Sequence, residues 1–129
     1  MKGKILFLIL FVISLTIEAQ VSDKNLIGKW RLKQVLSDPG DGSGDFEFIK
    51  SEKTIEFFTD GKVVSNGSIC GPYHQIGKKS EGTYSKENKT ISPSGCGKET
   101  KMNYELKNGY LIIHYSCKEG CAEKYEKIK

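Results

Sequence analysis

The sequence is poor in the residues and motifs that most enzymes and nucleic-acid-binding proteins need. It has two histidines, His74 and His114, and no G-x-S-x-G, H-E-x-x-H or P-loop motif. Lysine and glutamate are interleaved along the chain, so no concentrated basic stripe is present to bind a phosphate backbone. We therefore expect a protein that is not an enzyme, has no cofactor and binds no nucleic acid.

Long apolar runs are scarce as well, and the longest lies at the N-terminus. A short positive segment precedes an unbroken apolar run, Ile5–Ile13, and a cleavage point could follow Ala19. This is the layout of a signal peptide, and the run is shorter than the roughly 20 residues of a membrane span. An uncleaved anchor is the alternative. We expect residues 1–19 to be a signal peptide and residues 20–129 to form one secreted or periplasmic domain without a membrane span.

Helical patterns are missing too, because no stretch of the mature chain repeats its apolar positions every 3.6 residues. Short alternating runs, such as residues 101–107, follow one another between turn residues. Asp60-Gly61 and Asn108-Gly109 predict type I′ hairpin turns, which need positive φ at both positions. We expect an all-β protein, a small antiparallel up-and-down β-barrel of about eight strands. A two-sheet sandwich is the alternative.

The four cysteines indicate disulfide bonds, because an exported protein meets an oxidising compartment. Four cysteines allow three connectivities. In a meander, alternate turns lie at opposite ends, which places Cys70, Cys96, Cys117 and Cys121 at the same end of the barrel. Cys117 and Cys121 flank one three-residue turn, so we predict the pairs Cys117–Cys121 and Cys70–Cys96. A zinc site is the alternative, and the lack of a C-x₂-C knuckle argues against it, so no metal is expected.

The remaining polar candidates lie in loops or on a strand face. His114 should face solvent, opposite its apolar strand neighbours, and His74 lies in a polar loop where it could shape the mouth of the barrel. The Asp-rich loop 37–45 has carboxylates at EF-hand-like spacing, but Phe46 stands where the calcium loop needs glycine. We expect a flexible loop that covers or gates the barrel mouth.

One short motif resembles a known family. Gly28-Lys29-Trp30, at the start of the first strand, looks like the G-x-W signature of lipocalins. With loop 38–44, Asp60-Gly61 and the last two cysteines, the mature chain is similar to small secreted lipocalin-like proteins of Bacteroidetes-type bacteria. The resemblance implies that Trp30 packs across the bottom of the barrel and that a small apolar molecule binds inside. The interior positions expected to contact it are Trp30, Leu32, Phe57, Met102, Tyr104 and Ile113.

The size of the domain leaves a second function open. Without residues 1–19 the 129-residue chain has 110 residues, which is small for a lipocalin and puts a roomy cavity in doubt. A filled barrel would instead act as an interaction or inhibitor module, with its disulfide-braced loops binding an envelope protein. Fold analogy alone supports that alternative. In either case we expect a monomer.

Overall fold

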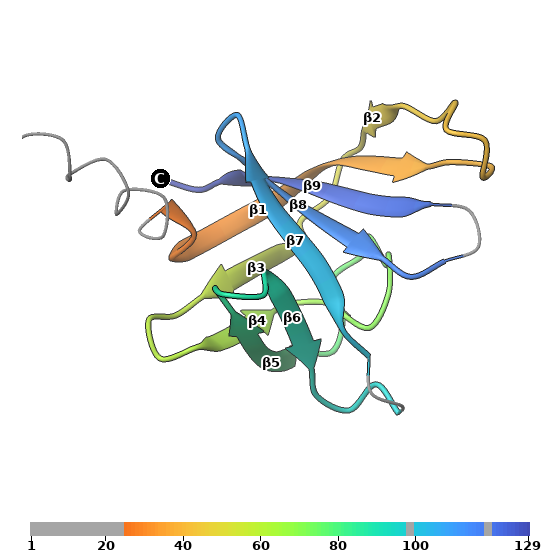
Figure 1. The fold of residues 1–129 in the computed structure, drawn as a ribbon. Helices are drawn as coiled ribbons and strands as arrows, with labels where there is room; N and C mark the ends of the chain where they lie inside the picture. The colour runs from red at the N-terminus through yellow and green to blue at the C-terminus, as the bar shows by residue number, and fades with distance from the viewer. Residues whose placement is uncertain (1–24, 98–99, 118–119) are drawn as a thin grey trace, which may run out of the picture.

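A computed structural model describes residues 25–97, 100–117 and 120–129 of the chain. The predicted signal peptide, residues 1–19, lies outside the described residues. The described chain forms one antiparallel sheet that curls into a barrel (Figure 1). Its strands are β1 (Gly28–Ser37), β2 (Phe46–Phe48), β3 (Thr54–Phe57), β4 (Lys62–Ser65), β5 (Ser80–Ser85), β6 (Thr90–Pro93), β7 (Met102–Lys107), β8 (Tyr110–Tyr115) and β9 (Cys121–Lys127).

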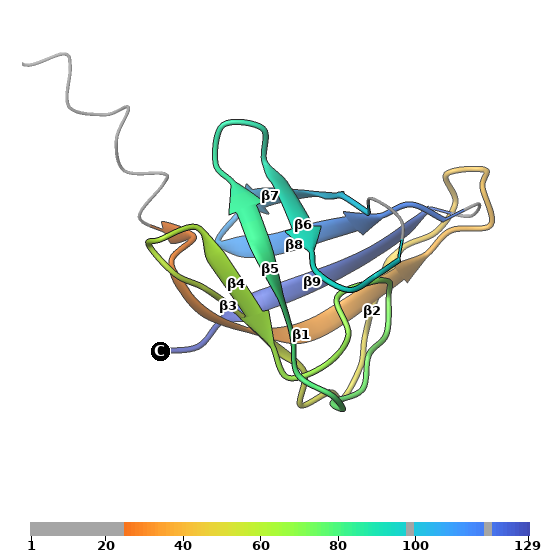
Figure 2. The ribbon, with the colours of Figure 1, turned by 90° about the horizontal axis from the view of Figure 1, so that it is seen from below.

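The long strand β1 closes the barrel. One edge of β1 pairs with β9, from Trp30↔Lys127 to Ser37↔Cys121. Its other edge pairs first with β3 and then, further along, with β2. The eight strands β1 and β3–β9 therefore form a closed ring, with β5 and β6 lying across from β8 and β9 in Figure 2. The prediction of a small antiparallel eight-stranded barrel is confirmed, and the sandwich alternative is wrong.

The strand after the Asp-rich loop is interrupted between β2 and β3. Ile49 N donates to Lys33 O, and Leu32 N donates to Lys53 O. Residues 50–52 therefore loop out while the chain passes from one partner position on β1 to the next. As a result β2 extends beyond the ring and pairs only with the outer end of β1.

The hairpin turns differ in type. Asn108 (φ 54°) and Gly109 (φ 82°) both have positive φ, as a type I′ turn requires. At the Asp60-Gly61 turn only Gly61 has positive φ (89°), and Asp60 Oδ1 accepts a hydrogen bond from Lys62 N. The type I′ prediction is therefore wrong there. The Asp60 side chain already caps the turn, and a single glycine then completes the reversal.

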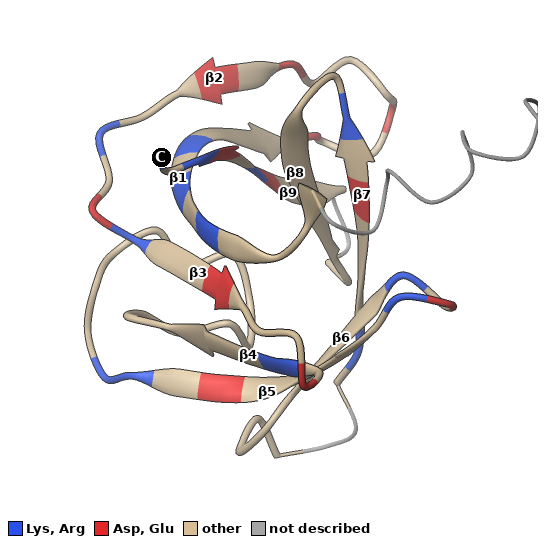
Figure 3. Cartoon of the chain, turned by 90° about the vertical axis from the view of Figure 1, so that its left-hand side faces the viewer, with Lys and Arg blue, Asp and Glu red and all other residues tan. Residues whose placement is uncertain are grey.

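Alternation along the strands produces the core. On β1, Trp30 and Leu32 point inward, while Lys29 and Arg31 face outward. Trp30 Nε1 donates to Leu26 O at 2.9 Å, which satisfies the polar atom of the largest buried side chain. Fourteen apolar side chains form a single buried cluster. On the outside, basic and acidic residues are mixed around the barrel (Figure 3).

The two ends of the barrel are different. The turns at 58–61, 86–89 and 108–109 lie at one end, and the longer loops lie at the other (Figure 1). Two disulfides brace the loop end, Cys70–Cys96 (Cα–Cα 5.4 Å) and Cys117–Cys121 (6.0 Å). The predicted connectivity is confirmed, and it is consistent with an oxidising location outside the cytoplasm. Within the described ranges, no helix is long and apolar enough to span a bilayer.

Candidate functional site

The six predicted ligand contacts lie together inside the barrel, packed against one another. Their exposed fractions range from 0% for Leu32 and Ile113 to 6% for Tyr104. The rings of Phe57 and Tyr104 lie 6.0 Å apart, centroid to centroid, and both belong to the single core cluster. A side chain that lined a ligand-sized void would keep some surface that water could reach. Leu32 and Ile113 have none, so the interior around them is filled.

A long loop, residues 66–79, closes the disulfide-braced end, and we call it the capping segment. Its base is joined by a hydrogen bond from Gly77 N to Asn66 O at 2.9 Å. The Cys70–Cys96 disulfide fastens it to the loop after β6. Two carbonyls of the segment are also held from below, because Lys53 Nζ donates to Tyr73 O at 2.5 Å and Ser51 Oγ donates to His74 O. The capping segment is therefore fixed to the barrel along most of its length.

Beneath the capping segment lies a buried ion pair. Lys53 Nζ is 3.4 Å from Glu123 Oε1, and both side chains are fully buried. The same oxygen accepts hydrogen bonds from the hydroxyls of Tyr115 (2.5 Å) and Tyr125 (2.9 Å). A buried carboxylate needs such donors because it has lost its hydration. The barrel interior is thus polar and hydrogen-bonded next to the capping segment, whereas the rest of the interior is apolar.

Burial changes the proton affinities of this cluster. Desolvation lowers the pKa of the Lys53 ammonium, and the negative charge of Glu123 opposes that shift. Desolvation, and next in size the charge of Glu123, raises the pKa of Tyr115 well above its ordinary value. For Tyr125, desolvation again comes first, followed by the charges of Tyr115 and Glu123. Both tyrosines therefore stay neutral and keep donating to Glu123 through the physiological pH range.

His74 approaches the same carboxylate from the capping segment. Its Nε2 atom lies 3.9 Å from Glu123 Oε2, and its side chain is 40% exposed. That oxygen accepts no hydrogen bond from the described part of the chain. The sequence placed His74 at the barrel mouth, and it does lie there, between solvent and a buried carboxylate. His114 is exposed on β8 as expected, 3.3 Å from Glu105 Oε1.

Two large apolar side chains of the capping segment are exposed next to backbone atoms that hydrogen bonds hold. Tyr73 is 60% exposed and Ile76 is 57% exposed. Lys78 and Lys79 follow after Gly77, and both are exposed. We call these four residues the capping face. A large apolar side chain on a fixed backbone is the usual anchor of a protein interface, because little conformational entropy remains to be lost on binding.

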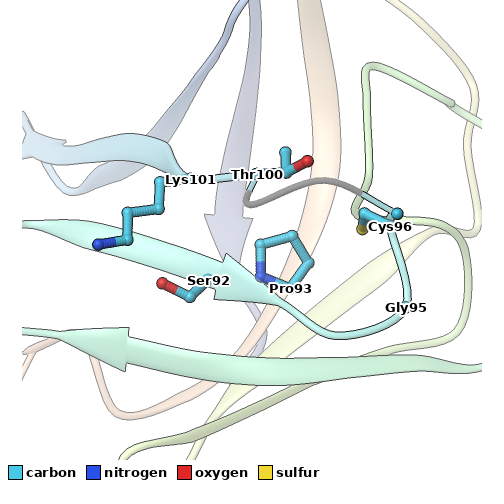
Figure 4. Close-up of a pocket in the computed structure, with 7 residues that line it drawn as sticks. Ser92, Pro93, Gly95, Cys96, Thr100 and Lys101 are labelled. Atoms are coloured by element: carbon cyan, nitrogen blue, oxygen red, sulfur yellow. The ribbon is translucent and has the colours of Figure 1, made fainter.

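A shallow pocket lies at the foot of the capping segment, beside its disulfide. It has a volume of about 360 Å³ and is open to solvent. Figure 4 shows the residues that line it. Pro93 and Lys101 lie on its two sides, and Cys96 lies near its far end. Its lining residues are Ser92, Pro93, Gly95, Cys96, Gly97, Thr100 and Lys101. The pocket offers few apolar contacts, so it extends the surface next to the capping segment without forming an enclosed site.

The Asp-rich loop does not take the gating role that we expected of it. Asp38 Oδ1 accepts hydrogen bonds from Gly40 N and Gly42 N, and Asp41 accepts from Ser43. Hydrogen bonds from Ser43 lower the pKa of Asp41. These contacts are internal to the loop, which extends past the end of β1 (Figure 1). Contacts to the buried ion pair come instead from residues 73 and 74. No group of three or more potential metal ligands occurs among the described side chains.

Sequence reasoning missed Lys53 and Glu123, although both follow the period of their strands. Lys53 is two residues before Ile55 and four before Phe57, so it points into the barrel with them. Glu123 precedes Tyr125 by two and has the same orientation. The signal was a charged residue in phase with inward-facing ones. Charged side chains are mostly exposed in proteins, so the pattern alone predicts surface positions for both residues.

Comparison with known proteins adds no relative to this picture. No protein-family model matches the chain, and neither the curated proteins nor the solved structures contain a significant match. What the fold and the site define is a class: a small, disulfide-braced, closed antiparallel barrel with a filled interior and one fixed loop across its end.

Proposed function

We propose that this chain is an exported, solid-core barrel that binds a partner protein through the capping face. One observation carries the proposal: Tyr73 and Ile76 are more than half exposed, yet the carbonyl of Tyr73 is fixed by the buried Lys53. Leaving apolar groups in water is unfavourable, and a rigid loop has no alternative conformation in which to hide them. The filled interior favours this function over transport of a small apolar molecule inside the barrel.

The chemistry of the capping face indicates the kind of partner. An aromatic ring and an aliphatic side chain need an apolar pocket or groove. The adjacent Lys78 and Lys79 favour acidic groups at its rim, because complementary charge speeds association and selects partners. We therefore propose an envelope protein with an acid-rimmed apolar site, met in the periplasm or outside the cell. The disulfides support that location, and the predicted signal peptide agrees with it.

Site-specific photocrosslinking tests the proposal. A photoreactive amino acid placed at Ile76 should crosslink one partner in envelope extracts, while the same group at Phe58 should not. Phe58 is the matched control, since it is 37% exposed at the opposite end of the barrel. The double substitution Tyr73→Ala and Ile76→Ala should abolish capture of that partner without lowering the melting temperature. Equal crosslinking from both positions, or capture by the double variant, would refute the proposal. A bound lipid found in the purified protein would favour the small-molecule function instead.

A further inference from the structure

A second feature lies on the outer face of the barrel, away from the capping face. Here β7, β8 and β9 form the floor of a groove, and β2 supplies one wall with Phe46. The groove has a volume of about 370 Å³, within the range of small-ligand sites. Its lining residues are Phe46, Glu105, Lys107, Asn108, Tyr110, Ile112, His114 and Lys124.

The floor of this groove is apolar where a barrel exterior is usually polar. Leu111 and Ile113 point into the core, so Ile112 must point outward. Ile112 is nevertheless only 4% exposed. It lies in one cross-strand row between Glu105 of β7 and Lys124 of β9. Ile112 therefore lies at the bottom of the groove, as an apolar residue of the outer face that the surrounding side chains largely cover.

Two aromatic rings line this groove, and the ammonium group of Lys124 lies near both of them. Lys124 Nζ lies 4.2 Å from the centroid of the Phe46 ring and 5.5 Å from that of Tyr110. Phe46 reaches Lys124 from β2, across β1, because both strands pair with the same stretch of β1 near Gln34–Leu36. The break between β2 and β3 therefore places the Phe46 ring on the outer surface, beside β8 and β9.

The charges of the groove favour an anion. Two lysines, Lys107 and Lys124, outnumber the one carboxylate among the lining residues, Glu105, whose Oε1 atom lies 3.3 Å from His114 Nε2. Lys124 and Lys107 have no carboxylate within 4.0 Å in the described chain, so their charges are not neutralised. The Lys124 ammonium lies near two ring faces, which attract its charge without accepting a hydrogen bond. Its N–H donors remain available to a ligand.

We propose that this groove binds a small aromatic carboxylate. The flat body of the ligand lies in the groove above Ile112, against the edges of the Phe46 and Tyr110 rings. Its carboxylate accepts charge-assisted hydrogen bonds from Lys124, with Lys107 adding a second positive charge. The site is independent of the capping face, shares no residue with it, and does not require a hollow barrel.

Titration of the full mature protein with 2-naphthoate, followed by amide NMR shifts, tests the site. The expected result is saturable shifts at Ile112, Tyr110 and Lys124, with none at Tyr73 or Ile76. Lys124→Met keeps the apolar stem and removes the charge, and it should weaken binding about 5-fold, as expected for a partly screened ion pair. Phe46→Ala should weaken binding about 10-fold, since it removes one ring contact.

Two matched controls and two altered ligands decide the outcome. Phe48→Ala changes the neighbouring ring of β2, which is 82% exposed and does not line the groove, and Lys62→Met removes a charge elsewhere. Both variants should bind as tightly as the unaltered protein. The neutral analogue 2-naphthylmethanol should bind more weakly than 2-naphthoate. No saturable shift at millimolar ligand, tighter binding of a naphthyl trimethylammonium ion, or equal losses in Phe46→Ala and Phe48→Ala would each overturn the proposal.

Discussion

Lys53 Nζ and Glu123 Oε1 lie 3.4 Å apart inside the barrel, and neither side chain has any exposed surface. Lys53 enters from the residue before β3, and Glu123 from the middle of β9, 70 positions later. Because β3 and β9 pair with opposite edges of β1, the ion pair links the two neighbours of β1 under the capping segment. The ammonium also donates to Tyr73 O. A core interaction is therefore coupled directly to the position of the proposed binding surface.

Removal of one partner of this pair should be costly. Lys53→Met leaves the Glu123 carboxylate buried without its counter-charge, and we expect a loss of about 3–5 kcal/mol in the free energy of unfolding. Adding Glu123→Gln to Lys53→Met should recover part of the loss, because the amide oxygen still accepts from both tyrosines and no charge remains buried. Urea unfolding followed by Trp30 fluorescence gives these values.

The control for that comparison is Lys62→Met. Lys62 Nζ is 3.3 Å from Glu81 Oε2, but both side chains are about half exposed. Such a pair contributes about 0–1 kcal/mol because water screens it. If Lys53→Met were no more destabilising than Lys62→Met, the buried pair would have no special structural role.

Stability should fall at high pH through Tyr115 and Tyr125. Their pKa values are raised in the folded protein, mainly by desolvation, above the ordinary value of 10.0. As the pH rises through about 10, the unfolded chain loses these protons while the folded chain keeps them, so folding becomes less favourable. Lys53 acts in the opposite direction. Its pKa is lowered in the folded protein, so at a pH just below about 10.4 the unfolded chain binds more protons than the folded chain, and this contribution makes stability rise with pH.

Tyrosine-to-phenylalanine variants separate the two effects. The alkaline loss of stability should be smaller in Tyr115→Phe and Tyr125→Phe than in the unaltered protein. Near-ultraviolet absorbance should show these two of the six tyrosines ionising only when the protein unfolds. Ionisation of all six in one transition near pH 10, with the fold intact, would contradict the buried positions of both hydroxyls.

The Cys70–Cys96 disulfide should fix the capping segment. It spans 26 residues of sequence, and its loss should cost about 3–4 kcal/mol. The paired substitution Cys70→Ser and Cys96→Ser should also speed amide hydrogen exchange between residues 71 and 77. Cys117–Cys121 spans only 4 residues, so its removal should cost less and leave exchange in the capping segment unchanged. Equal exchange in both variants would show that other contacts hold the segment.

A filled interior predicts a cavity penalty. Phe57 is 1% exposed and packs edge-on against Tyr84, with ring centroids 5.1 Å apart. Phe57→Ala should therefore cost about 3–5 kcal/mol. Native mass spectrometry should find the unaltered protein without a bound apolar molecule. An apolar ligand that binds inside the unaltered protein and raises its melting temperature would instead support the expectation of a hollow barrel.

Much of the fold follows from local signals. The alternation on β1 orients Trp30 inward because side chains of a strand point to opposite faces in turn. Asn108-Gly109 fixes one hairpin, since both residues tolerate positive φ. The cysteine pairs follow from the meander, because alternate turns lie at opposite ends. These features depend on neighbours in the chain or on one simple topology.

The sequence by itself determined the all-β class, the number of strands in the ring, the inward faces and the disulfides. Tertiary structure alone decided that Lys53 and Glu123 meet, that residues 66–79 close the loop end, and that Phe46 reaches Lys124. The physical reason is distance along the chain. Local periodicity states which way a side chain points, whereas the partner that compensates a buried charge is fixed only when the barrel closes.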